Sequence, residues 1–228
     1  MNTGTIRAMG DGVNVRGAKR QYHAPRRLEQ AAATRHSILS AARDLFVQHG
    51  YDGATVSAIA RRAGVSLDTV YATVGRKSAL LRELVETAIS GSDQAVPAEQ
   101  RDYVMRIRAA TTARDKLAIY ARAITEIQQR MAPVFLALRD AAATDPECAT
   151  LWSEIAARRA SNMRTFALEL RGTGELRDDL SNDQVADIVW SMNAAEYWVL
   201  LVRERAWSPD QFAAWLTDAW TRLLLQSP

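Results

Sequence analysis

The sequence predicts an all-α protein of about nine or ten helices, and three observations support this fold class. Ala, Leu and Arg, which are strong helix formers, are abundant among the 228 residues. Apolar residues recur at three- and four-residue spacing along most of the chain, as they do on one face of a helix. No run of useful length alternates between apolar and polar residues, so no strand is expected.

The N-terminal residues 1–26 contain four glycines and show no apolar periodicity, which predicts a disordered basic arm. A helical pattern begins at Leu28 and is expected to end at Gly50, because glycine readily adopts the left-handed conformation that closes a helix. Two short helices should follow, over Val56–Ala63 and Leu67–Thr73.

Capping residues and a glycine define these two short helices. Thr55 and Ser66 precede them as N-caps, and Gly64 permits the tight turn between them. A longer amphipathic helix is expected over Lys77–Ser90. Residues 27–92 therefore form the first predicted domain, which ends where Gly91 and Ser92 interrupt the helical pattern.

Residues 93–228 form the second predicted domain, which is helical throughout. Its helix starts are marked by prolines at first-turn positions and by Ser-x-x-Gln capping boxes. The expected helices are Pro97–Ala109, Ala113–Arg130, Pro133–Ala143, Pro146–Arg171, Asn182–Arg205 and Pro209–Gln226.

Charge is distributed unevenly along the chain. Residues 1–82 hold 13 Lys and Arg against 5 Asp and Glu, whereas residues 83–228 hold 16 against 21. A basic N-terminal third on an acidic body favours a polyanionic partner for the first part, although the same charges could form a solvated face.

Other patterns exclude several classes of protein. The three histidines lie in the arm or the first helix, and none forms a recognisable motif with the single cysteine, Cys148. No Gly-rich phosphate loop, metal-ligand spacing or nucleophile elbow is present, so the sequence predicts no enzyme, no cofactor and no metal site. No apolar stretch approaches the roughly 20 residues that cross a bilayer, and no secretory signal is apparent, so a cytoplasmic protein is expected.

The segment Thr55–Val74 has the features of a helix-turn-helix. Two short helices joined by a glycine turn place the second helix across the DNA major groove. Val56, Ile59 and Val70 form a small core, and hydroxyl groups on the opposite face suit phosphates and base edges. The same pattern also occurs where helices pack against proteins.

A longer run, Thr34–Val85, resembles the N-terminal domain of the TetR/AcrR family of transcriptional regulators. The matching residues recur at fixed spacing: Thr34, Ile38, Ala41, Ala42, Leu45, Phe46, Gly50, Thr55, Val56, Ile59, Ala60, Ala63, Gly64, Val65, Ser66, Thr69, Tyr71, Lys77, Leu80 and Leu81. The resemblance implies a double-stranded DNA operator, a homodimer and a small-molecule effector as partners.

The resemblance also implies which residues contact DNA. They lie at the starts of the two short helices, along the second one and at the start of the next: Thr55, Ser66, Leu67, Asp68, Thr69, Tyr71, Ala72, Thr73, Arg76 and Lys77. Arg61, Arg62 and Arg76 either meet phosphates or face solvent. The arm residues Arg16, Lys19, Arg20, Arg26 and Arg27 either reach a minor groove or add nonspecific attraction.

Two positions depart from the family pattern. Family members usually have glycine at Asp68 and an aromatic residue at Val74. Asp68 either favours the helix dipole or influences base selection, and Val74 requires a compensating contact.

In the second domain, the resemblance implies a dimer interface and an effector cavity. The expected seam involves Pro146–Arg171 and Asn182–Arg205, supported by Pro209–Gln226. The cavity candidates are Tyr120, Ile124, Phe135, Trp152, Phe166, Asn193, Glu196 and Tyr197, although such residues are often plain core.

Glu196 shares a predicted inward face with Val185 and Met192, where an uncompensated carboxylate is costly. It is therefore expected either to pair with Arg159 or Arg164 or to meet a ligand. Effector binding is expected to displace Lys77–Ser90 and so release DNA. A packed core that senses a protein partner or nothing, and an activator rather than a repressor, are the alternatives.

Overall fold

The computed structural model describes Met1, residues 24–91 and residues 97–226. Within these ranges the chain is helical, and the extended pairing is an isolated bridge between Leu176 and Leu225. The all-α prediction is confirmed. The helices are α1 Ala24–Gly53, α2 Val56–Ala63, α3 Leu67–Thr73, α4 Lys77–Ser90, α5 Asp102–Ala109, α6 Ala113–Ala141, α7 Pro146–Arg171, α8 Asn182–Met192, α9 Ala195–Trp198 and α10 Pro209–Leu224, with a 3-10 turn, Ala98–Gln100, and a π-helical segment, Val199–Glu204.

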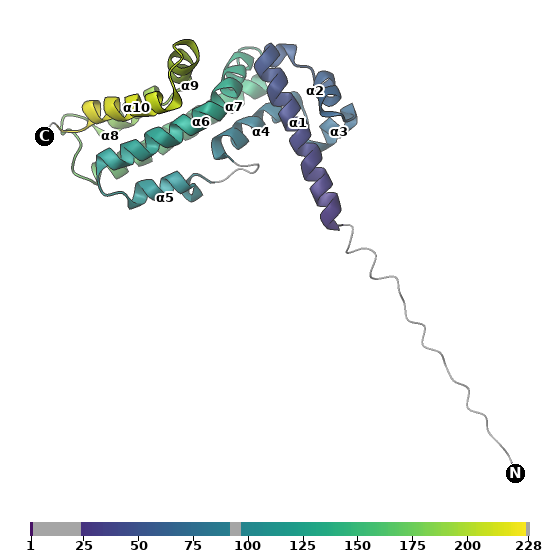
Figure 1. Cartoon of the computed structure of the whole chain (residues 1–228), viewed down its shortest axis with the longest axis horizontal. Coiled ribbons are helices and arrows are strands. Elements are labelled where there is room, and N and C mark those ends of the chain that lie inside the picture. Colours follow the sequence, from purple (N-terminus) through teal and green to yellow (C-terminus); the bar gives the residue numbers. More distant parts are fainter. Residues whose placement is uncertain (2–23, 92–96, 227–228) are drawn as a thin grey trace.

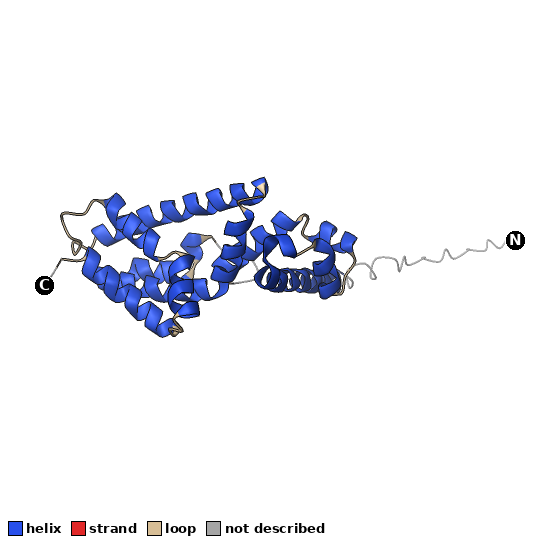
Figure 2. Ribbon diagram, turned by 90° about the horizontal axis from the view of Figure 1, so that it is seen from above, coloured by secondary structure: helices blue, strands red, loops and turns tan. Residues whose placement is uncertain are grey.

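The helices form an elongated molecule (Figures 1 and 2). Helices α1–α3 lie at one end, and α8 and α10 lie toward the other. The long helix α6 runs through the body and contacts α1, α4, α5, α7, α9 and α10. Helix α4 packs on α1 and α6, and so connects the N-terminal end to the body.

The helix-turn-helix forms as the capping residues predict. The Thr55 hydroxyl accepts a hydrogen bond from the Ala58 amide at 3.1 Å, and Gly64 ends α2 with φ of 70° and ψ of 30°. Ile59 and Val70 are fully buried beneath the two helices. The turn is therefore fixed by local chemistry and by a small shared core.

The predicted arm lies outside the described residues, apart from Met1 and positions 24–26. Those last positions belong to α1, so the expectation that the first helix begins near Leu28 is wrong. Proline is tolerated in a first helical turn because its missing amide has no acceptor there, so Pro25 permits the earlier start.

Two predicted helices are one helix in the structure: α6 passes through Pro133 without a break. Proline removes one backbone hydrogen bond and strains one turn, which normally costs about 3 kcal/mol in a helix interior. Ala132, Val134 and Phe135 are buried around it, so packing holds the helix together across this position.

The predicted helix Asn182–Arg205 is interrupted after Met192. The buried Asn193 leaves helical geometry, and its carbonyl accepts a hydrogen bond from Gln128 Nε2 at 2.6 Å. This interhelical bond competes with the helical pattern, and a π-helical segment follows α9.

Two other predicted ends also differ. Arg101 is extended, so α5 begins at Asp102 rather than Pro97. At the other end, α10 stops at Leu224, because Leu225 pairs with Leu176 and the Gln226 amide donates to Glu175 O at 3.0 Å.

No single helix in the described ranges is long and apolar enough to cross a membrane; Asn182–Met192 and Ala195–Glu204 pass only as a bent pair, by length and composition. Val185, Val189 and Trp198 in this pair are buried in the protein core.

Gly50 provides a test of backbone strain. Its φ of 69° and ψ of 179° lie in a region that is essentially restricted to glycine. No atom lies within 4 Å of an added Cβ, so the cost of Gly50→Ala comes from the backbone alone. We expect a loss of about 1–3 kcal/mol in the free energy of unfolding, measured by urea denaturation.

Gly172→Ala is the matched control. Gly172 has φ of −62° and ψ of −15°, and its added Cβ makes ordinary contacts at 3.6 Å. This change should be neutral or stabilise by about 0.4–1 kcal/mol. Equal destabilisation by both substitutions would contradict the assignment of strain to Gly50.

Candidate DNA-binding surface and ligand cavity

Helix α3 presents one face to solvent. Tyr71 is 48% exposed and Leu67 is 40% exposed, and Asp68 and Ala72 are exposed beside them. Val70, on the opposite face, is fully buried. These four predicted contact residues therefore share an accessible surface, whereas Thr69 and Thr73 are half-buried at its edge.

The hydroxyl groups next to this surface already have partners. Thr55 caps α2, and Ser66 Oγ accepts from the Thr69 amide at 3.1 Å. Ser66 Oγ also lies 2.7 Å from Thr69 Oγ1, so these two hydroxyls share a hydrogen bond. Their first role is to hold the start of α3, and any phosphate contact adds to it.

Arg76 and Lys77 point in different directions. The Arg76 side chain is 82% exposed, with Nη1 3.5 Å from Glu147 Oε1. Lys77 Nζ instead lies 4.0 Å from the centre of the Tyr51 ring, where burial lowers the pKa of its ammonium. The structure thus turns the Lys77 ammonium toward Tyr51, although its backbone still begins α4.

The two departures from the family pattern have simple surroundings. Asp68 is exposed in the first turn of α3, where a carboxylate favours the helix dipole. Val74 is half-buried and packs against the core, which is the compensating contact expected for it. Arg62, which the sequence predicts either to meet phosphates or to face solvent, pairs with Asp44 at 2.8 Å.

A cavity of about 660 Å³ lies among α4, α5, α6 and α7. Its volume falls within the range of roughly 300–1,000 Å³ that is typical of small-molecule sites. Much of its lining is apolar: Ile89, Tyr103, Val104, Ile107, Tyr120, Ile124, Ile127, Met131, Ile155, Met163 and Phe166.

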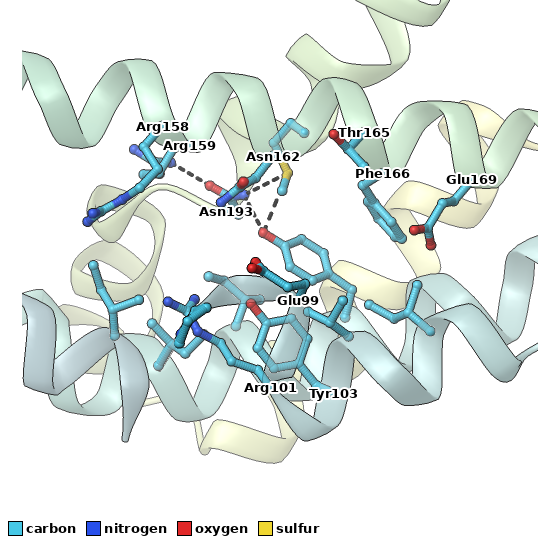
Figure 3. A pocket seen from close by; sticks show the side chains of 18 of the residues that line it. Glu99, Arg101, Tyr103, Arg158, Arg159, Asn162, Thr165, Phe166, Glu169 and Asn193 are labelled. Carbon is cyan, nitrogen blue, oxygen red and sulfur yellow. Dashed lines mark hydrogen bonds between the residues drawn. The ribbon is translucent and has the colours of Figure 1, made fainter. Parts of the chain in front are cut away.

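A polar cluster lies within this apolar lining (Figure 3). Asn193 Nδ2 donates to Tyr120 Oη at 2.8 Å, and Arg159 Nη2 donates to Asn193 Oδ1 and, at 3.1 Å, to the Trp190 carbonyl. Burial raises the pKa of Tyr120 and lowers that of Arg159. The Arg159 guanidinium also lies 5.1 Å from the Trp190 ring centre.

The comparisons with known proteins agree with this arrangement. Residues 38–84 match the family model described as "Bacterial regulatory proteins, tetR family". The N-terminal domain belongs to the TetR family. No curated protein matches the sequence.

Solved structures of TetR-like fold extend the likeness over most of the chain. NalD of Pseudomonas aeruginosa, the secondary repressor of the MexAB-OprM multidrug efflux pump, has a TM-score of 0.67 and 19% identity, covering 87% of this chain and 98% of its own. FadR of Bacillus subtilis, in complex with stearoyl-CoA, has a TM-score of 0.65 and 19% identity, covering 81% and 96%.

A third structure is a putative transcriptional regulator from Saccharomonospora viridis in complex with choline. It has a TM-score of 0.63 and 19% identity, and covers 85% of this chain and 98% of its own. At such identities the likeness shows the fold alone: an N-terminal helix-turn-helix followed by a C-terminal helical domain.

Only half of the predicted cavity residues line the cavity. Tyr120, Ile124, Phe166 and Asn193 do so. Phe135 and Trp152 stack on each other at 4.6 Å and are not among its lining residues.

The predicted inward positions of Glu196 and Tyr197 are wrong. The Glu196 side chain is 43% exposed and pairs with Arg139 at 3.2 Å, whereas Tyr197 packs against Trp215 at the surface. The break at Asn193 rotates the following helix, so the face extrapolated from Val185 and Met192 does not continue to Glu196.

Sequence reasoning missed all the charged residues that line the cavity: Glu86, Glu99, Arg101, Arg108, Arg158, Arg159 and Glu169. One pattern could have indicated Arg159. It lies four residues after Ile155 and four before Met163, so a cation interrupts an apolar stripe that faces inward.

Polar contacts connect α4 to α7 along their shared edge. The Ser78 hydroxyl donates to Glu147, Arg82 pairs with Glu154 at 2.7 Å, and Arg158 pairs with Glu86 at 2.8 Å. Because Glu86 and Arg158 also line the cavity, this edge reaches from the ligand cavity to the start of α4.

A further contact connects the end of α1 to α7. Tyr51 Oη donates to Asp145 Oδ2 at 2.7 Å, and Asp145 Oδ1 accepts from the Glu147 and Cys148 amides at the start of α7. The Tyr51 hydrogen bond is the largest cause that lowers the pKa of Asp145.

The Tyr51–Asp145 contact predicts a pH-dependent effect on stability. A carboxyl whose pKa is lowered by folding stabilises the protein above its unfolded pKa of about 3.9, and this contribution is lost as pH falls through the folded pKa. Tyr51→Phe should therefore cost about 1 kcal/mol at pH 7 and progressively less below about pH 4. Urea denaturation of both proteins across this range measures the difference.

Tyr103→Phe is the control, because Tyr103 is a tyrosine with no hydrogen bond to a carboxylate in the described ranges. Its effect should not vary over the same pH interval. A Tyr51→Phe cost that stays constant down to pH 2.5 would contradict the coupling to Asp145.

Proposed function

We propose that this TetR-family protein is a cytoplasmic, non-enzymatic repressor that binds a palindromic operator as a homodimer and is released by a small-molecule effector. We further propose a helix-turn-helix domain over residues 27–92 and an effector-binding and dimerisation domain over residues 93–228, with a basic arm before them.

One observation carries this proposal: the same helix borders both candidate sites. Helix α4 begins directly after α3, and further along it contributes Glu86 and Ile89 to the cavity. A ligand that moves α4 would therefore change the position of α3. Neighbours of the same fold are described with stearoyl-CoA and with choline, which supports a ligand in this cavity.

The proposed DNA contacts are those on and around α3. Leu67, Asp68, Tyr71 and Ala72 form its exposed face, Thr69 and Thr73 flank it, and Arg76 is exposed just after it. Thr55, Ser66 and the start of α4 at Lys77 supply helix N-termini that suit phosphates.

A dimer is proposed because two recognition helices must reach successive major grooves about 34–36 Å apart. Of the residues that suggested the predicted seam, Ile155 and Met163 of α7 line the cavity and Val185 of α8 is buried, so they are not free to contact a second copy. We place the interface instead on an apolar surface face made of Tyr197, Leu200, Trp207 and Trp215. Tyr197 and Trp207 both pack on Trp215, and Leu200 is 51% exposed.

Release follows as a shift between two populations. The free dimer holds its two α3 helices at operator spacing, and ligand among α4–α7 favours a state with different spacing. By linkage, operator DNA must weaken ligand binding by the same factor as ligand weakens DNA binding.

The DNA-binding part of the proposal is tested with Tyr71→Ala. Selection of bound fragments from a random DNA pool should enrich a palindrome, and fluorescence anisotropy then measures affinity for it. Loss of the Tyr71 ring should weaken binding by about 1–3 kcal/mol, roughly five- to 150-fold, with little change in melting temperature.

Met105→Ala on α5, also at an exposed apolar residue, is the control. Failure to enrich any palindrome, or unchanged affinity in Tyr71→Ala, would contradict this reading.

The dimer interface is tested with Leu200→Glu. A carboxylate placed in an apolar interface should weaken dimerisation at least about tenfold, as measured by sedimentation equilibrium. Leu168→Glu, at a similarly exposed leucine on α7, should leave dimerisation unchanged. The opposite pattern would move the interface to α7.

A further inference from the structure

Arg159 is a half-buried cation that lines the cavity. It interrupts the apolar stripe of α7, and desolvation lowers the pKa of its guanidinium below the ordinary value. Only its Nη2 group has hydrogen-bond partners within the described ranges, namely Asn193 Oδ1 and the Trp190 carbonyl. The three N–H groups on Nε and Nη1 therefore remain available.

Glu99 lines the cavity without an ion pair to Arg159, and three other nearby carboxylates pair with other cations. Glu86 pairs with Arg158 at 2.8 Å, Glu169 lies 3.6 Å from Arg108, and Glu196 pairs with Arg139 at 3.2 Å. Among the described residues, Arg159 has no carboxylate within ion-pairing distance. Partial desolvation of a charge that has no ion pair is costly, and such groups are concentrated at functional sites.

Opposite charges lie at the two ends of the cavity. Figure 3 shows Arg158 and Arg159 at one end, Glu169 at the other, beyond Phe166, and Glu99 between them. Tyr120 and Phe166 pack together at 5.0 Å between these ends. Beside them, Ile107, Ile124 and Ile127 give an apolar surface that suits a hydrocarbon chain or ring.

We propose that the effector of this protein is an amphipathic carboxylate, with its anionic group on Arg159 and its apolar part against Tyr120 and Phe166. This inference rests on the proposed function, which places an effector in this cavity. A guanidinium matches a carboxylate because its planar N–H groups can donate two parallel hydrogen bonds. A permanently cationic ligand would instead be repelled by the positive charge of Arg159.

The same geometry indicates how ligand binding could change the contacts of α4. Arg158, next to Arg159 on α7, holds Glu86 of α4. An anion at this end of the cavity competes with Glu86 for the arginine pair and weakens one of the contacts that fix α4 against α7.

The experiment compares carboxylates with neutral molecules of the same shape on the full chain. The probes are decanoate against decanamide and 4-phenylbutanoate against 4-phenylbutanamide, with decyltrimethylammonium as the cationic probe. Isothermal titration calorimetry should show at least one acid binding at least about tenfold more tightly than its amide. An amide or the ammonium binding as tightly as the acids, or no acid binding, would overturn the proposal.

Arg159→Met should remove this preference, so that acid and amide bind alike. Arg164→Met is the matched control, because Arg164 lies on the same helix with its side chain 65% exposed, and the preference should persist in it. If Arg159→Met does not fold, as judged by circular dichroism, Arg159→Lys replaces it and should reduce the acid-to-amide ratio. An unchanged ratio in the folded Arg159 variant would overturn the assignment.

Operator binding is measured separately by anisotropy. If carboxylates bind but do not release the operator, the proposed ligand class stands and the proposed release mechanism is contradicted. A DNA pool that yields no palindrome would contradict the proposed function whatever the carboxylates do. Failure of the ligand proposal and failure of the proposed function are therefore distinguishable.

Discussion

Helix α6 is buried along most of its length, and the other elements of the body take their positions from it. It packs on α1 and α4 at one end and on α5, α9 and α10 further along. Leu117, Val134 and Leu138 are completely buried in these contacts. Because packed interiors resist small changes in volume, this helix cannot shift without disturbing several neighbours at once. Motion between the two candidate sites must therefore involve α4 and α7, which flank it.

The single buried residue Asn193 influences both the path of the chain and the cavity. Its carbonyl is held by Gln128 of α6, its amide nitrogen donates to Tyr120, and its amide oxygen accepts from Arg159. These bonds interrupt the helix after Met192 and also position the cation at the cavity. A single buried amide thus sets both the direction of the chain toward α10 and the polarity of one end of the cavity.

The helix-turn-helix could be predicted from the sequence because its determinants are local. Thr55 and Ser66 act as caps and Gly64 supplies the left-handed turn, all within twenty residues. The cavity could be predicted only in part, because its lining comes from four helices whose relative rotation is not a local property. Residue type alone predicts Tyr120 and Asn193, whereas the periodicity of Val185 and Met192 does not extend to Glu196, because the Gln128 contact breaks the helix between them. Pro133 shows the reverse case, in which packing keeps a helix intact where local propensity ends it.

The contacts that hold α4 have unequal strengths. Its apolar residues Leu80, Leu81 and Val85 are fully buried, and each such side chain contributes about 1.5–3 kcal/mol. The pairs Arg82–Glu154 and Arg158–Glu86 are partly exposed, and pairs of this kind contribute about 0–1 kcal/mol each. Helix α4 is therefore held firmly on α1 and α6 and loosely on α7.

This difference sets a requirement on the effector. Shifting a two-state equilibrium from 1:99 to 99:1 requires a ligand to favour one state by about 5.5 kcal/mol. Displacement of Glu86 from Arg158 supplies only a small part of this. The remainder must come from the apolar part of the ligand, through contacts with Ile89 of α4 and with Tyr120 and Phe166 that differ between the two states. An anionic group alone would occupy Arg159 without releasing DNA, so both ends of an amphipathic ligand are needed.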